Sequence, residues 1–263
     1  PIALLLAGYL LARWPDAACS IFALLLYTNA SAVAVQFHHV PFLVAAAFPL
    51  LLCLPIARDL WLRGEAPVLP SALPFMLAFF VVQLLGALFS VRPEEAMDEL
   101  KTFVLEGCLL FVLVTNAVRS PAVLRQVLWS LIAAGAFMGA LVTYQQLTGT
   151  FDNNYYGFAQ VDIGAKGFVI DAAVDKLRQP RLGGPLAMPN RFAQIMAVLI
   201  PIAMFQIHAS RSRRAKLLAG AALAPILIGG ALGFSRGAAV ALALVSPAVL
   251  ILGRVSVRQL LAV

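Results

Sequence analysis

Charged residues are scarce in this chain of 263 residues. Only 12% are Asp, Glu, Lys or Arg, whereas 62% are hydrophobic, and the mean hydropathy is +0.93. Soluble globular domains have about 25% charged and about 45–50% apolar residues, so the composition excludes an ordinary soluble domain. Apolar runs recur along the whole chain, and a single signal peptide does not account for them. We therefore predict an all-α fold, a polytopic transmembrane helical bundle.

Cysteine and histidine are also few, with three of each. The cysteines, Cys19, Cys53 and Cys108, lie in or beside apolar runs and have neither the spacing of a metal site nor a disulfide pattern. We interpret them as small buried hydrophobic residues. The net charge of +7 does not indicate a nucleic-acid partner, because in a membrane protein the placement of Lys and Arg in the loops is the relevant signal.

The apolar runs predict about eight or nine membrane spans in a single transmembrane domain over residues 1–263. The expected spans lie near residues 1–12, 18–36, 41–57, 71–90, 102–118, 125–147, 190–208, 217–233 and 237–253. A spanning helix needs about 20 apolar residues, and the first run is shorter and begins with proline. We therefore expect the sequence to be a fragment of a longer protein.

The charges in the connectors predict the orientation of these spans. The connector Arg211-Ser-Arg213-Arg214-Ala-Lys216 carries four cations in six residues, and the positive-inside rule places it in the cytoplasm. Alternation of the spans then places most other connector arginines inside as well, namely Arg13, Arg58, Arg63, Arg119, Arg125, Arg254 and Arg258. The polar segment 149–188 becomes an outer loop, which in a bacterium is periplasmic. Its aromatic residues fit an interfacial aromatic belt better than a surface that stacks on sugar rings.

Two short stretches place arginines beside predicted helix starts on the outer side, one from Arg181 to Arg191 and one from Gly233 to Gly237. A helix start presents unpaired N–H groups and the positive end of the helix dipole, and arginine adds a planar fork of donors. These features favour binding of a phosphate or pyrophosphate. The alternative is that the arginines snorkel to lipid headgroups. The candidate pyrophosphate-binding residues are Arg181, Asn190, Arg191, Ser235 and Arg236, with Asn190 and Ser235 expected to cap the helices.

Three further titratable residues are weaker candidates. Glu106 lies within an apolar run, where a carboxylate is costly; a functional role and a structural ion pair fit equally well. His38 and His39 lie in a short outer loop with no nearby carboxylate, so an ordinary loop pair is favoured over a general base.

The order of several motifs resembles the O-antigen ligase family, the polytopic bacterial glycan ligases and polymerases. The resemblance covers about residues 75–250 of this chain. The motifs are Ser90-Val-Arg-Pro-Glu-Glu-Ala, Val114-Thr-Asn-Ala-Val-Arg, Tyr144-Gln-Gln-Leu-Thr-Gly, Arg181…Gly184…Pro189-Asn190-Arg191-Phe-Ala and Phe234-Ser235-Arg236-Gly237-Ala.

The resemblance implies a GT-C-like glycosyltransferase of the bacterial inner membrane. Such an enzyme transfers a glycan from undecaprenyl pyrophosphate to lipid A–core or another acceptor on the periplasmic face, without a metal or nucleotide cofactor. Arg181 matches the family arginine thought to contact the pyrophosphate, Arg236 matches the Ser-Arg-Gly arginine, and Arg191 stands where the family varies. The family's essential histidine and a further arginine lie in a downstream loop that this sequence does not contain. We therefore expect no catalytic base in this fragment and no activity of the fragment alone.

Two alternatives remain at this stage. A polysaccharide polymerase of the same family shares these motifs. A transporter or flippase would show inverted repeats and helices broken near the membrane midplane. No convincing internal repeat is present, but Pro41, Pro49 and Pro55 are compatible with a break in the third span.

Overall fold

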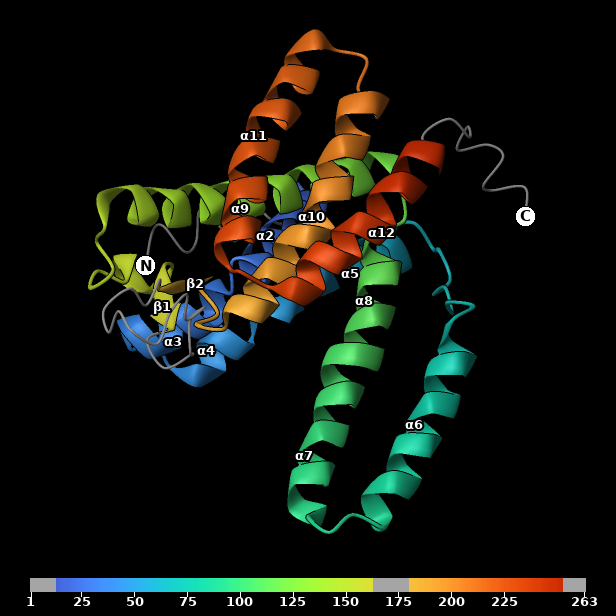
Figure 1. Ribbon diagram of the computed structural model, residues 1–263. Coiled ribbons are helices and arrows are strands. Elements are labelled where there is room, and N and C mark those ends of the chain that lie inside the picture. The colour runs from blue at the N-terminus through green and yellow to red at the C-terminus, as the bar shows by residue number, and fades with distance from the viewer. Residues whose placement is uncertain (1–12, 163–179, 253–263) are drawn as a thin grey trace. The chain divides into compact units, whose positions relative to one another are not determined.

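The computed structural model describes residues 13–162 and 180–252 (Figure 1). The expected span at 1–12 and much of the loop 149–188 lie outside these residues. The chain divides into two compact units, which are described separately. Unit 1 comprises the described residues of Pro1–Phe22 and Ala47–Val127, and unit 2 comprises those of Ala23–Ala46 and Leu128–Val263. Helix α2 (Pro15–Tyr27) and helix α9 (Pro121–Thr148) contribute residues to both.

Unit 1 consists of helical segments, some of which form a helical hairpin. Besides the start of α2 and of α9, its elements are η1 (Phe48–Leu52), α5 (Cys53–Ala57), η2 (Arg58–Leu62), α6 (Leu73–Leu88), α7 (Pro93–Thr102), η3 (Phe103–Leu109) and α8 (Leu110–Ala117). Helix α6 runs antiparallel to α7 and α8 (Figure 1), and Phe79 meets Phe103 edge to face at 5.5 Å. The hydrophobic core of the unit contains Cys19, Phe22, Leu52, Ala117 and Val123.

Unit 2 consists of helices and one small two-stranded sheet. Its other elements are α3 (Ala30–His38), α4 (Phe42–Ala46), η4 (Tyr155–Gly157), β1 (Gln160–Asp162), β2 (Arg181–Gly184), α10 (Pro189–Ala209), α11 (Arg213–Leu232) and α12 (Arg236–Leu252). The strands are antiparallel, with Val161 opposite Leu182 and Asp162 opposite Arg181. Helices α10 and α11 form an antiparallel pair, and α12 packs on α10 (Figure 1).

Glycines allow α9 and α11 to pack closely in unit 2. A Cβ added to Gly139 would overlap the carbonyl oxygen of Pro225, and one added to Gly229 would lie 2.8 Å from the Cα of Gly139. Small residues at such crossings let two helix backbones approach, as is common in membrane bundles. The core of the unit surrounds this crossing and α10; it comprises Ile132, Met138, Val142, Leu182, Phe192, Met196, Leu199, Ile200, Ala203 and Ile226.

The helical fold and its apolar character are confirmed. Within the described residues, five helices are long and apolar enough to cross a membrane: Phe42–Leu62, Pro93–Ala117, Pro121–Thr148, Pro189–Ala209 and Arg213–Leu232. A bent pair of helices would raise this number to six. The expected number of eight or nine spans and the GT-C-like architecture therefore stay predictions.

The expected span at 18–36 is observed as two helices with a break between them. Helix α2 ends at Tyr27, α3 begins at Ala30, and the two are bent by 59°. Asn29 at the break has a left-handed φ of 52°, and its side-chain N–H donates to the carbonyl oxygen of Pro185 at 3.0 Å. Asparagine tolerates this conformation better than most residues, so a contact from a distant segment stabilises a break that the local apolar pattern does not show.

Candidate functional site

Arg181 on β2 joins the two arginine-containing stretches. Its Nη2 donates to the side-chain oxygen of Asn190 at 2.7 Å and to the carbonyl oxygen of Gly233 at 3.0 Å, with the Phe234 carbonyl oxygen further away at 3.4 Å. Asn190 lies in the first turn of α10, and Gly233 and Phe234 form the turn between α11 and α12. One guanidinium group therefore connects the starts of two apolar helices.

Two glycines allow β2 and the turn between α11 and α12 to approach α10 closely. Gly184, at the end of β2, has a φ of 55°, and a Cβ there would lie 2.5 Å from the ring of Phe192. A Cβ on Gly233 would lie 2.9 Å from the carbonyl oxygen of Pro189 and 3.0 Å from the Cβ of Ala193. The strand and the α11–α12 turn thus both reach the first turns of α10 because they carry no side chain at these points.

The expectation that Asn190 caps α10 is wrong. The helix begins at Pro189, and the N-cap is Met188, with φ −119° and ψ 98°. Proline suits the first helical position because its φ is already helical and its missing N–H would have had no helical partner. Asn190 is therefore inside the first turn, where its side-chain oxygen accepts the hydrogen bond from Arg181.

Ser235 occupies the capping position that its sequence context predicts. Helix α12 begins at Arg236, and the Ser235 hydroxyl oxygen accepts a hydrogen bond from the N–H of Ala238 at 3.4 Å. This contact satisfies one of the unpaired N–H groups of the helix start.

The charges around this site are positive. Arg191 and Arg236 are both exposed, Arg191 in the first turn of α10 and Arg236 as the first residue of α12. Neither first turn contains an acidic residue. The hydrogen bonds given above for Arg181 all go to uncharged oxygens, and Asp162 lies opposite Arg181 in the sheet. Together with the dipoles of two helix starts, these cations favour an anion.

The backbone is strained immediately before each helix start. Ala187 has a φ of 55° and Phe234 a φ of 47°. Such left-handed conformations cost on the order of 1 kcal/mol for a residue with a side chain, and they are found preferentially at functional sites. Here they turn the chain so that α10 and α12 both begin beside Arg181.

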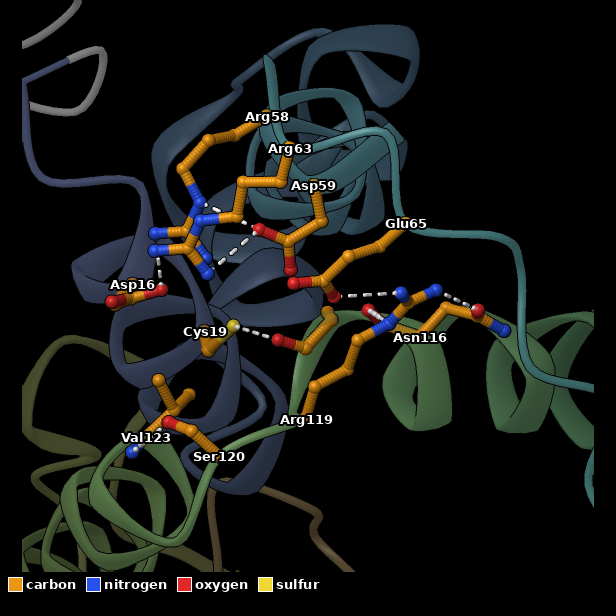
Figure 2. A network of polar contacts seen from close by, with 11 residues as sticks. Asp16, Cys19, Arg58, Asp59, Arg63, Glu65, Asn116, Arg119, Ser120 and Val123 are labelled. Carbon is orange, nitrogen blue, oxygen red and sulfur yellow. Dashed lines mark hydrogen bonds and ion pairs between the residues drawn. The ribbon is translucent and has the colours of Figure 1, made fainter. Parts of the chain in front are cut away.

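A second polar cluster, in unit 1, pairs arginines with carboxylates (Figure 2). Asp59 is buried, with 3% of its side chain exposed, and accepts from Arg58 at 2.8 Å and Arg63 at 3.2 Å. Arg58 also pairs with Asp16 of α2 at 2.8 Å. The two aspartates are not among the candidate residues predicted from the sequence, although an aspartate four residues before an arginine is a recognisable helical pair.

The same cluster holds the segment that follows η2 against the end of α8. The side chain of Asn116 accepts from the N–H of Val68 at 2.8 Å and donates to the carbonyl oxygen of Val68 at 2.9 Å. Arg119 donates to Asn116 at 2.6 Å and pairs with Glu65 at 3.2 Å. The N–H of Glu65 donates to the Asp59 carbonyl oxygen, which links the two halves of the cluster.

The other candidates take different positions. Glu106 is exposed within η3 and forms no ion pair with another described residue. His38 is exposed, with its Nε2 3.2 Å from the carbonyl oxygen of Tyr156, and His39 ends α3 with a φ of 54°. In the described part of the chain, no three His, Cys, Asp or Glu side chains gather closely enough to hold a metal ion.

Comparison with known proteins found no family model, no curated protein and no solved structure that matches this chain. The resemblance to O-antigen ligases therefore rests on the order and spacing of the motifs. The arrangement around Arg181 is a separate observation, made from the contacts alone.

Proposed function

We propose that this chain is part of an O-antigen-ligase-type glycosyltransferase of the bacterial inner membrane. In this proposal the protein transfers an O-antigen or similar polysaccharide from undecaprenyl pyrophosphate to lipid A–core or another acceptor on the periplasmic face. The observation that carries the proposal is the convergence at Arg181, whose guanidinium contacts both Asn190 and the Gly233 carbonyl oxygen. Two of the five motifs that suggest the family from sequence, the Arg181–Arg191 stretch and the Phe234–Gly237 stretch, meet at this residue.

The proposed reaction is an inverting displacement at the anomeric carbon of the donor sugar. An acceptor hydroxyl attacks this carbon and loses its proton to a base, while the bond from the carbon to the pyrophosphate oxygen breaks. Undecaprenyl pyrophosphate leaves with the electron pair and an increased negative charge. Fixed cations and helix N-termini that face this charge would lower the barrier, because they are oriented before the reaction begins.

The three arginines have different roles in this proposal. Arg181 positions the starts of α10 and α12 through its Nη2, and its buried Nε has no partner among the described residues. A pyrophosphate oxygen would satisfy that donor, and a hydrogen bond to a charged group contributes about 1.5–3 kcal/mol. Arg191 and Arg236, which are exposed at the two helix starts, would contact the remaining phosphate oxygens.

The proposed orientation agrees with the pairing of charges in unit 1. Alternation of the spans assigns Arg58, Arg63 and Arg119 to the cytoplasmic side, and all three belong to one polar cluster. Residues that share a cluster lie on the same side of a membrane. The alternation of spans in the sequence assigns the Arg181 site to the periplasmic side in this proposal.

A transporter is the second candidate, favoured by the bend between α2 and α3. Helices interrupted near the membrane midplane are typical of transporter binding sites, and α2 and α3 form an apolar pair that is bent by 59°.

The test is turnover by the full-length protein in liposomes with an undecaprenyl-pyrophosphate-linked glycan. Release of undecaprenyl pyrophosphate that requires lipid A–core, and that Arg181→Ala abolishes, would support the ligase. Release with glycan alone, yielding longer chains, would identify the polymerase. No release under either condition would contradict the transferase and favour the transporter, as would normal turnover by the Arg181→Ala variant.

A further inference from the structure

The turn that follows α9 is held in place by hydrogen bonds and packing contacts of buried residues. Gln145 is fully buried, and its side-chain N–H groups donate to the carbonyl oxygens of Asn153 and Ala159, both at 2.9 Å. Gly157 has a φ of 93°, and a Cβ there would overlap the ring of Phe37 on α3. The turn is therefore fixed at both ends and packed against α3.

Within this turn, two successive tyrosines adopt a backbone conformation that bulky residues avoid. Tyr155 has a φ of 48° and Tyr156 a φ of 60°. The conformation leaves Tyr156 77% exposed. A large aromatic residue held in a strained conformation and directed outward, rather than into the core, is a candidate for binding.

Four aromatic side chains in and beside this turn form two ring contacts; we call them the tyrosine platform, and its members are His38, Tyr144, Tyr155 and Tyr156. The ring of Tyr156 stacks on that of His38, with centroids 6.1 Å apart and an interplanar angle of 20°. Tyr144 is 55% exposed and meets Tyr155 edge to face at 5.9 Å. All four belong to unit 2.

Hydroxyl, amide and carboxylate groups lie in the same turn. The hydroxyl of Thr148 hydrogen-bonds that of Thr150 at 2.7 Å, and Thr150 in turn hydrogen-bonds the hydroxyl of Tyr155. The side chains that precede Tyr155, namely Asp152, Asn153 and Asn154, are exposed. The turn thus offers flat apolar rings beside groups that both donate and accept hydrogen bonds.

We propose that the tyrosine platform binds a sugar ring of the glycan. A pyranose has an apolar face of C–H groups, which packs on an aromatic ring, and an edge of hydroxyl groups, which pairs with amides, carboxylates and hydroxyls. The choice of a saccharide rests on the proposed function as well as on this chemistry. An interfacial aromatic belt would not require two tyrosines in strained conformations beside three exposed polar side chains.

The test measures binding of soluble sugars to the full-length protein in lipid nanodiscs, with maltohexaose and chitohexaose as probes and saturation-transfer NMR as the readout. We expect binding to the unsubstituted protein, and Tyr156→Ala should weaken it about three- to tenfold. Tyr156→Phe should retain binding because it keeps the ring. Trp61→Ala, which removes another exposed aromatic residue (85% exposed) from unit 1, should have no effect. Absence of binding to both probes, or equal binding by Tyr156→Ala, would overturn the proposal.

A second measurement separates this site from a membrane belt. The protein is reconstituted with lipids whose acyl chains are brominated near the headgroups, and quenching of its tryptophan fluorescence is measured. These lipids should quench the Tyr156→Trp variant no more than they quench the unsubstituted protein. Additional quenching would place the residue in the bilayer and contradict a sugar site.

The Arg181→Ala variant distinguishes failure of this inference from failure of the proposed function. It should lose turnover and retain sugar binding. If the unsubstituted protein shows no turnover but binds sugars through Tyr156, the platform stands and the transferase does not. If it turns over but Tyr156→Ala leaves both sugar binding and turnover unchanged, the platform is wrong and the transferase stands.

Discussion

Arginines serve different purposes in the two units. In unit 1, Arg58 and Arg119 are mostly buried and pair with carboxylates at 2.8–3.2 Å. In unit 2, Arg181 donates to an amide oxygen and to backbone carbonyl oxygens instead. The first arrangement joins segments through ion pairs, whereas the second joins segments through hydrogen bonds to uncharged oxygens.

The type of partner that each arginine has indicates more about its function than the number of arginines does. A carboxylate that pairs with an arginine competes with any anionic ligand for the same donors. Neutral acceptors orient a guanidinium without cancelling its charge. We therefore expect substitutions in the unit 1 cluster to reduce stability and those at Arg181 to reduce turnover.

The largest expected effect is that of Asp59→Ala. The substitution removes the more buried of the two carboxylates that lie 2.8 Å from Arg58, whose side chain is only 17% exposed. Removing one member of a buried ion pair costs about 3–5 kcal/mol. Thermal unfolding of the purified protein in detergent should show a markedly lower midpoint. Asp98→Ala is the matched control, because Asp98 pairs with Lys101 at the same 2.8 Å but on the surface, where such pairs contribute little. Equal midpoints for the two variants would contradict the comparison.

The second prediction compares Arg181→Ala with Arg119→Ala directly. Loss of a preorganised donor to developing charge lowers turnover about 100-fold, so Arg181→Ala should reduce release of undecaprenyl pyrophosphate by this factor. Arg119→Ala should leave turnover of the folded fraction unchanged and lower the free energy of unfolding by about 2 kcal/mol. The two readouts are initial rate per folded molecule and denaturation midpoint. If both variants changed the same readout, the proposed division of roles would be wrong.

A smaller effect is expected when the approach of α12 to α10 is blocked. A Cβ in Gly233→Ala would lie 2.9 Å from the Pro189 carbonyl oxygen, which must move. Overpacking of this kind costs about 1–3 kcal/mol, and it should also reduce turnover by displacing the acceptor of the Arg181 hydrogen bond. Gly237→Ala is the control, since nothing lies within 4 Å of the added Cβ. Turnover should be unchanged in the control and reduced in Gly233→Ala.

The smallest effect is expected from Ser235→Ala. Loss of a capping hydroxyl costs about 0.5–2 kcal/mol, and the 3.4 Å contact to Ala238 favours the lower end of this range. Ser235→Asp, which keeps a capping oxygen but adds negative charge, should preserve stability and weaken the proposed anion site. Turnover equal to that of the unsubstituted protein in Ser235→Asp would argue against an anion at this helix start.

The ends of most helices were close to those predicted from the sequence. The expected span 190–208 is observed as Pro189–Ala209, and 125–147 as Pro121–Thr148. Hydropathy and proline positions are local properties, so they can be read without a structure. The N-cap of α10 was missed because Asn190 favours a capping position by type, whereas Pro189 before it is favoured as the first helical residue.

Contacts between distant segments were less predictable. The sequence indicated that Arg181 and Ser235 mark helix starts, but not that one guanidinium reaches Asn190 and Gly233. It also gave no sign that Arg58 pairs with Asp16 or that Arg119 pairs with Glu65. Both arrangements depend on which helix faces pack together, and many packings are compatible with the same apolar pattern.

The sequence by itself determined the membrane character, the helical class and the approximate limits of most spans, because these follow from hydropathy along short windows of chain. Contacts between distant segments determine which arginines pair with carboxylates and which donate to uncharged oxygens. That outcome depends on the close approach of backbones at glycines such as Gly233 and on turns such as that at Asn29, which is held by a contact with Pro185. Such contacts join residues far apart in the chain, and local propensity does not specify them.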